Sequence, residues 1–151
     1  MRPSTVIASV FGIGYFPFAS GTVASLAAMP LAALILVHGG NIMLAVASLI
    51  AFAIGVWACG DHVRATGRED PSECVIDEVA GQWLACAFAS ATLPSLVLAF
   101  FLFRLFDIWK PWPVDWADRE LPGGLGVMAD DMIAGLMAGV LVALIRYLVP
   151  L

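Results

Sequence analysis

Five uncharged apolar stretches, separated by charged segments, constrain the fold of this chain more than any other feature. They cover residues 22–37, 42–59, 79–92, 95–103 and 132–145. About 20 mostly apolar residues are needed for a helix to cross a bilayer. The second stretch reaches this length, and so does the last when it is extended to residues 127–149. The pattern predicts an all-α, polytopic membrane bundle of about five apolar helices.

The composition agrees with a lipid environment. Only 13% of the 151 residues are charged, about half of the quarter found in an average soluble domain. We expect one membrane-embedded domain over residues 1–151, much of it covered by lipid. The net charge of −5, with no cluster of Lys and Arg, excludes a nucleic-acid partner.

Two structures are compatible with residues 75–106. The segment is either one long helix kinked at Pro94 or a hairpin of two helices that turns at residues 91–95. Loops 60–74 and 107–126 each hold two basic residues, whereas the turns at 38–41 and at Pro94 hold none. Because Lys and Arg accumulate in short cytoplasmic loops, a hairpin places both charged loops on the cytoplasmic face of the membrane.

Acidic residues collect at the expected cytoplasmic ends of the helices. They are Asp77, Glu78, Asp107, Asp130 and Asp131. A single Asp can cap a helix N-terminus, but adjacent helical residues point about 100° apart, so two acidic pairs exceed what capping requires. Clustered carboxylates near lipid repel one another unless a cation neutralises them. An all-oxygen ligand set favours Mg²⁺ or Mn²⁺ over zinc, and Mg²⁺ also takes phosphate oxygens as ligands. We therefore predict a divalent-metal site and a phosphorylated ligand.

The two acidic pairs belong to similar short segments, residues 77–81 and 130–135. In each segment a glycine follows an acidic residue by four positions, Gly81 after Asp77 and Gly135 after Asp131. This spacing leaves a small-residue groove on the same helix face as the carboxylate. The similarity is compatible with an internal duplication or with chance.

Basic and glycine residues supply candidate phosphate ligands. Arg104 and Lys110 lie on one helical stripe with Asp107, where they form either a salt-bridged face or a site for a lipid phosphate. Gly21 and Thr22 open an apolar helix, which is a common anion site and also an ordinary helix start. The aromatic belt expected at the interface comprises Trp109, Trp112 and Trp116.

Four sequence blocks resemble phosphatidylglycerophosphatase A. They are SGTVASLAAMP (residues 20–30), ECVIDEVAGQW (73–83), FRLFDIWKPWPVDWADRE (103–120) and GGLGVMADDMIAG (123–135). Together they cover nearly half of the chain in the order of the family. One residue departs from the family pattern, which usually has Pro where this chain has Ser20.

The resemblance implies a Mg²⁺-dependent membrane enzyme that converts phosphatidylglycerophosphate to phosphatidylglycerol. It carries over Asp77, Glu78, Asp130 and Asp131 as metal ligands, with Asp107, Lys110 and Asp131 as catalytic residues. The substrate-binding candidates are Gly21, Thr22, Arg104, Lys110 and Arg119. Asp107 is expected to act either as a general base for water or as a nucleophile.

Two other functions remain open at this stage. One is a different lipid-phosphate phosphatase or phosphotransferase, and the other is a small divalent-cation carrier. A carrier needs ionisable groups near the middle of the membrane, whereas these acids lie at helix ends. Small residues on several helices indicate close packing within one chain or between chains, so a homo-oligomer is a further alternative.

Overall fold

The computed structural model describes residues 2–151, and over them it contains helices and loops but no strand. The elements are α1 (Pro3–Ala8), the 3-10 turn η1 (Ile13–Tyr15), α2 (Ser20–Thr66), α3 (Ile76–Cys86), α4 (Leu93–Trp109), α5 (Val114–Glu120) and α6 (Gly123–Leu148). The prediction of an all-α fold is confirmed.

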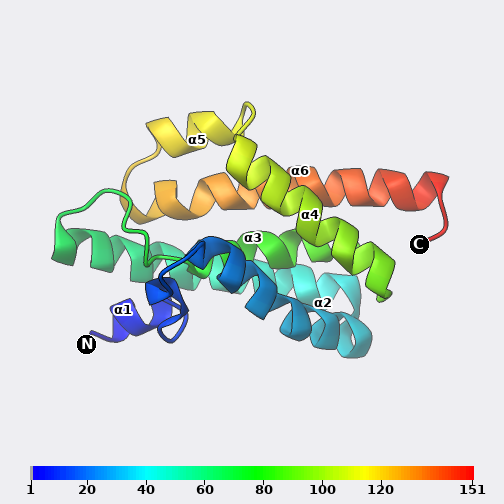
Figure 1. Cartoon of the computed structure of the whole chain (residues 1–151), viewed down its shortest axis with the longest axis horizontal. Helices are drawn as coiled ribbons and strands as arrows, with labels where there is room; N and C mark the ends of the chain where they lie inside the picture. The colour runs from blue at the N-terminus through cyan, green and yellow to red at the C-terminus, as the bar shows by residue number, and fades with distance from the viewer. Residues whose placement is uncertain (1) are drawn as a thin grey trace.

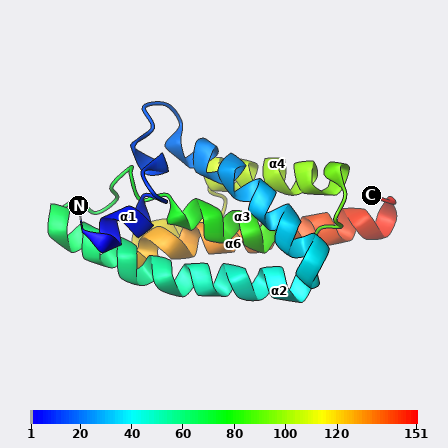
Figure 2. The same ribbon diagram turned by 90° about the horizontal axis from the view of Figure 1, so that it is seen from below.

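Helix α2 bends at Gly40. The φ of 82° and ψ of −179° at Gly40 fall in a backbone region that essentially only glycine adopts. Two limbs, residues 20–39 and 41–66, spread apart from this bend (Figure 2). The sequence predicted a turn at residues 38–41, and the bend lies within it.

Helices α3 and α4 form a hairpin. Helix α3 ends at Cys86 and α4 begins at Leu93, with Pro94 in the first turn of α4. Proline is tolerated there because its missing N–H would have no partner within the helix. The Ser95 hydroxyl accepts a hydrogen bond from the Ser90 N–H at 2.8 Å, which closes the turn. The hairpin is therefore correct, and the single kinked helix is excluded.

Within residues 2–151, two helices are long and apolar enough to cross a membrane, Ser20–Thr66 and Gly123–Leu148. Helix α3 has 11 residues and α4 has 17, fewer than the roughly 20 that span a bilayer. The prediction of about five apolar spanning helices is therefore not confirmed. The middle apolar stretches, residues 79–92 and 95–103, are themselves shorter than a full span.

Helix α3 lies at the centre of the molecule, between α2 and α6 (Figures 1 and 2). Its contact with α6 depends on glycine. A Cβ added to Gly135 would lie 2.3 Å from the carbonyl oxygen of Gly81, and one added to Gly81 would lie 2.6 Å from the carbonyl oxygen of Asp131. The backbones of α3 and α6 therefore touch directly, which fixes the separation of the residues that precede each glycine.

Candidate active site

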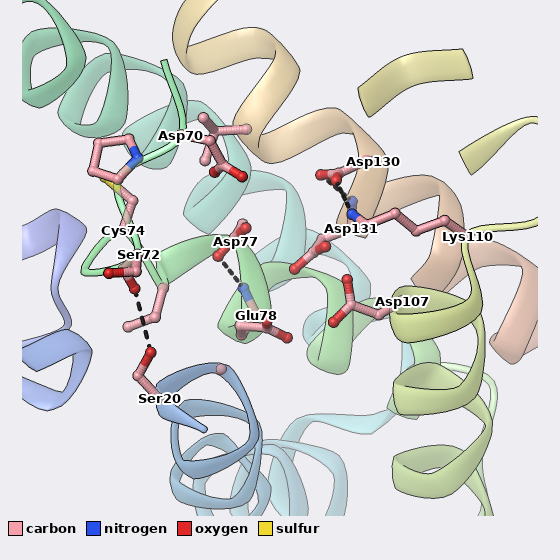
Figure 3. Close-up of a pocket in the computed structure, with 14 residues that line it drawn as sticks. Ser20, Asp70, Ser72, Cys74, Asp77, Glu78, Asp107, Lys110, Asp130 and Asp131 are labelled. Atoms are coloured by element: carbon pink, nitrogen blue, oxygen red, sulfur yellow. Dashed lines mark hydrogen bonds and ion pairs between the residues drawn. The ribbon is translucent and has the colours of Figure 1, made fainter. Parts of the chain in front are cut away.

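A polar cavity of about 210 Å³ lies where the start of α2, the start of α3, the end of α4 and the first half of α6 converge (Figure 3). The six carboxylates that line it are Asp70, Asp77, Glu78, Asp107, Asp130 and Asp131. Lys110 and Gly21 also line the cavity. Residues predicted from four separate segments of the sequence are thus brought together in one place.

The two acidic pairs have the same local geometry. The Glu78 N–H donates to Asp77 Oδ1 at 2.8 Å, and the Asp131 N–H donates to Asp130 Oδ1 at 2.8 Å. In each pair the first carboxylate is held by the backbone of the second. The similar segments 77–81 and 130–135 thus contain the same hydrogen bond between acidic neighbours. Their glycines, Gly81 and Gly135, contact each other where the two helices cross.

One local prediction about these pairs is wrong. Asp130 and Asp131 were expected to begin a helix, but α6 begins at Gly123, about two turns earlier. The glycine-rich run is helical because it packs against α2, where a Cβ on Gly124 would lie 2.2 Å from the carbonyl oxygen of Val56. Capping of a helix N-terminus therefore does not account for Asp130 and Asp131.

The carboxylates approach closely enough to share a cation. Oxygens of Asp77, Asp130 and Asp131 lie within 4.8 Å of one another, as do oxygens of Glu78, Asp107 and Asp131. Asp131 belongs to both groups, and its Oδ2 is buried with no hydrogen-bond partner. A buried carboxylate oxygen without a partner is costly. The oxygen-only donor set and this free oxygen both fit a hard divalent cation.

Two basic side chains pair with different members of the acidic group. Arg104 donates to Glu78 Oε2 at 2.7 Å and to Asp107 Oδ2 at 2.5 Å. Lys110 donates to Asp130 Oδ2 at 2.9 Å. The backbone of Lys110 has a positive φ of 53°, an uncommon conformation for a residue other than glycine, and it ends α4.

Burial and neighbouring negative charges oppose the ionisation of the carboxylates at the start of α3. Burial and the negative charges of Glu78, Asp130 and Asp107 raise the pKa of Asp77 well above its usual range. Burial and Asp107 raise the pKa of Glu78 to about 7, although Arg104 acts in the opposite direction. Burial alone would lower the pKa of Lys110, but Asp130 outweighs it and raises this pKa. The cavity therefore holds more negative charge than its own basic residues neutralise.

The predicted substrate ligands do not all lie in the cavity. Gly21 lines it, and a Cβ there would lie 2.4 Å from Glu78 Oε1. Thr22 is half-buried and is not part of the lining. Arg119 also lies outside: it pairs with Asp115 at 3.3 Å and lines a neighbouring polar cavity. Sequence could not place Arg119 because α5 turns it away from the acidic residues.

Sequence reasoning missed the loop between α2 and α3. Asp70 and Ser72 from this loop line the cavity. Glu73 holds the loop in place. Its carboxylate accepts a hydrogen bond from Arg68, and its Oε1 lies 2.8 Å from His62 Nε2. A signal was available in the charged run from residue 68 to residue 73, which is longer than a simple connection requires.

Comparisons with known proteins identify one family. The chain matches the family Phosphatidylglycerophosphatase A over residues 6–146. It is 35% identical to "Phosphatidylglycerophosphatase A" of Escherichia coli, over 93% of this chain and 82% of the relative, and 32% identical to the protein of the same name from Haemophilus influenzae, over 97% and 91%.

A relative with a different name is equally similar. The chain is 36% identical to the "Putative phosphatidylinositol-3-phosphatase" of Bacteroides thetaiotaomicron, over 98% of both chains. No solved structure matches the chain. The family match extends over nearly the whole sequence and includes all of the acidic residues of the cavity. The chain therefore belongs to the phosphatidylglycerophosphatase A family.

Proposed function

We propose that this protein is a Mg²⁺-dependent phosphatase that hydrolyses phosphatidylglycerophosphate to phosphatidylglycerol and phosphate during phospholipid synthesis. The family membership and two of the relatives' names support this activity. The observation that carries the proposal is Asp131, which belongs to both groups of carboxylates, drawn from three helices, and has a buried oxygen without a hydrogen-bond partner.

The acidic pairs are the proposed metal ligands. Asp77, Glu78, Asp130 and Asp131 would hold Mg²⁺, which when bound neutralises phosphate charge and polarises the phosphoryl group. Lys110 and Arg104 add positive charge beside the same cavity and would pair with phosphate oxygens. The N-terminus of α2 at Gly21 offers backbone N–H groups that have no helical partner.

Asp107 is the proposed base. Arg104 holds its carboxylate in place at 2.5 Å, and Asp107 would accept a proton as water attacks phosphorus. The bond between phosphorus and the glycerol oxygen then breaks, and the departing oxygen takes up a proton. In the alternative, Asp107 attacks phosphorus directly, the same bond to the glycerol oxygen breaks, and water then hydrolyses the resulting aspartyl phosphate to release phosphate and the free carboxylate. Single-turnover trapping decides between them, because a phosphorylated Asp107 peptide would exclude direct attack by water.

We also propose that the protein crosses the bacterial inner membrane several times, with this cavity facing the cytoplasm. Two helices of sufficient length and hydropathy support membrane insertion. The basic residues of the two charged loops support the orientation.

The test is phosphate release by the purified protein in mixed micelles. We expect hydrolysis of phosphatidylglycerophosphate with Mg²⁺, loss of activity with EDTA, and recovery when Mg²⁺ is restored. Phosphatidylinositol 3-phosphate serves as the competing substrate because of the third relative's name. Preferential release from the inositol lipid would overturn the proposed substrate, and Mg²⁺ uptake into proteoliposomes without phosphate release would indicate a carrier.

Removing charge from the acidic pairs tests the metal assignment. Asp77→Asn and Asp131→Asn are each expected to lower turnover by at least about a hundredfold, because even residues that only support a metal ligand contribute about 10–100-fold. Both variants should stay folded but lose the rise in thermal midpoint that Mg²⁺ gives the original protein. Full activity in both would contradict the assignment. Glu120→Gln, which removes an exposed charge outside the cavity, is the control.

A further inference from the structure

A second cavity, of about 580 Å³ and almost entirely apolar, lies beside the acidic one. Its walls are the two limbs of α2, which diverge from the bend with α3 between them (Figure 2), and the N-terminal segment, which contributes Ile7, Val10, Phe11 and Ile13. The first limb contributes Ala24, Ala27, Ala28, Leu31 and Ile35, and the second contributes Ala47, Ile50, Ala51 and Ile54. We call this cavity the α2 groove.

The α2 groove and the acidic cavity share two structural elements. On α3, Asp77 and Glu78 line the acidic cavity, while their neighbours Ile76 and Val79 line the groove. On α2, Gly21 lines the acidic cavity and Ala24, one turn later, begins the groove. A molecule bound across these two turns therefore has its polar end among the carboxylates and its apolar end in the groove.

The dimensions of the groove match a lipid chain. From Ala24 to Ile35, the residues of the first limb that line the groove, the helix rises about 17 Å, at about 1.5 Å per residue. One leaflet contributes about half of the roughly 30 Å hydrocarbon core. Alanines on both walls keep the space open, and no charged residue lines it. The exposed Leu31 and Ile50 leave its edge accessible from lipid.

We propose that the α2 groove binds one acyl chain of the phospholipid substrate and makes hydrolysis depend on chain length. The proposal rests on the proposed function, because the groove is assigned to the substrate whose phosphate enters the acidic cavity. The glycerol backbone would cross the first turn of α2 beside Ser20, whose hydroxyl donates to the Ser72 carbonyl at 3.3 Å on the exposed rim.

The first experiment fills the groove from each wall. Ala27→Phe and Ala47→Phe place a ring in the space, and neither alanine is fully buried, so both variants can fold. Activity is measured on dihexanoyl and dipalmitoyl phosphatidylglycerophosphate in mixed micelles of constant composition. We expect kcat/KM for the long lipid relative to the short one to fall at least about tenfold, because each excluded methylene is worth about fourfold.

Two matched substitutions are the controls. Ala53→Phe adds the same ring to an exposed position of α2 outside the groove lining. Ala33→Phe fills a separate apolar cavity between α2 and α4. Both should keep the chain-length ratio of the original protein. An unchanged ratio in both groove variants, or a fall in the ratio in Ala33→Phe instead, would overturn the assignment.

A second readout does not depend on turnover. Phosphatidylglycerophosphate and phosphatidylcholine, each with a mid-chain diazirine, are irradiated with the protein, and the labelled peptides are mapped. We expect the phosphate lipid to label residues 24–35 more than phosphatidylcholine does, and Ala27→Phe to abolish the difference. Equal labelling by both lipids would show a lipid-facing crevice and overturn the proposal. Wild-type protein that labels selectively but hydrolyses neither chain length would instead contradict the proposed function.

Discussion

At the scale of single residues, the shape of the acidic cavity depends on Gly21, which has no side chain, as well as on the carboxylates themselves. Gly21 approaches Glu78 so closely that any side chain would displace the Glu78 carboxylate. The Ser25 hydroxyl donates to Oε2 of that same carboxylate at 3.2 Å, and Arg104 donates to it at 2.7 Å. The position of Glu78 is therefore set by a hydroxyl, a guanidinium group and a missing Cβ.

Gly21→Ala tests this packing. Its new Cβ would lie 2.4 Å from Glu78 Oε1, and we expect activity to fall by at least about tenfold because small displacements of catalytic groups are costly. The protein should remain folded, as circular dichroism would verify. Gly39→Ala is the matched control on the same helix, where the new Cβ meets only the flexible Met43 side chain. Equal activities of the two variants would contradict the role of Gly21.

The raised pKa of Glu78 predicts how the metal-free protein responds to pH. This pKa is 4.5 ordinarily and about 7 in the fold, so the folded state binds a proton more tightly than the unfolded state does. The resulting stabilisation is complete below about pH 4.5 and is lost as pH rises through 7. We expect the thermal midpoint in EDTA to fall over this range, and to fall less in Glu78→Gln. A midpoint that rises with pH would contradict this.

The candidate site residues differ in how far sequence could predict them. The acidic pairs and Lys110 were found because charge is conspicuous beside apolar stretches, and all of them line the cavity. Asp70 was missed, and Arg119 lines a neighbouring cavity instead of the acidic one. Asp70 lies in a loop and Arg119 in the short helix α5, where the path of the chain depends on tertiary contacts and not on a long repeating pattern.

At the scale of secondary structure, the crossing of α3 and α6 holds the site together. Backbone contact at Gly81 and Gly135 brings two acidic turns side by side without long side chains between them. Small residues at a helix crossing allow this close approach. The similar segments 77–81 and 130–135 therefore act as one unit, although 48 residues of sequence lie between them.

Gly135→Ala is expected to separate these helices. The added methyl group would lie 2.3 Å from a backbone oxygen, which cannot move aside as a flexible side chain can. Overpacking of this kind costs about 1–3 kcal/mol, and thermal unfolding in detergent would measure it together with a loss of activity. Gly60→Ala, whose Cβ would have no neighbour closer than 3.7 Å, should unfold at the original temperature or slightly above it. Equal destabilisation of both variants would contradict the crossing model.

Hydropathy predicted the turns of the bundle better than its helix ends. The bend at Gly40 and the turn before Pro94 were anticipated, because each interrupts an apolar stretch. The second limb of α2 was expected to end at residue 59, yet α2 continues to Thr66. Helices α1 and α5 were not anticipated. Apolar sequence indicates the part of a helix that is expected to face lipid, not the residue at which the helix ends. Beyond that part the helix continues until a residue such as Gly67, with a φ of 71°, ends it.

At the scale of the whole molecule, polar side chains gather at the two ends of the helix bundle. The charged end carries the acidic cavity. At the other end, Asn41 donates to the Ala87 and Ala89 carbonyls at 2.7 and 2.9 Å, and Arg146 donates to the Phe88 carbonyl at 2.7 Å. The bend of α2 and the end of α6 are thus both tied to the turn that follows α3. Between the ends, exposed apolar side chains cover the outer helix faces, as expected for a surface in contact with lipid.

Cysteine accessibility tests the proposed orientation. Cys59, Cys74 and Cys86 are buried, so labelling should report mainly on introduced cysteines. Glu120→Cys, at the end of α5, should react with a membrane-impermeant maleimide in inside-out vesicles, and His38→Cys, beside the bend, should react in right-side-out vesicles. Reaction of both on the same side of the membrane would exclude the topology.

The glycine contact between α3 and α6 also bears on which ions the proposed metal site would accept. Since the backbone fixes the spacing of the two acidic turns, the cluster has little freedom to widen around a larger ion. Mg²⁺ binds oxygen at about 2.0–2.1 Å and Ca²⁺ at about 2.3–2.6 Å in looser shells. We therefore expect the site to discriminate between Mg²⁺ and Ca²⁺ by ionic radius, so that Ca²⁺ replaces Mg²⁺ poorly. The cause of this preference would be the fixed spacing of the two helices and not the chemical identity of the ligands.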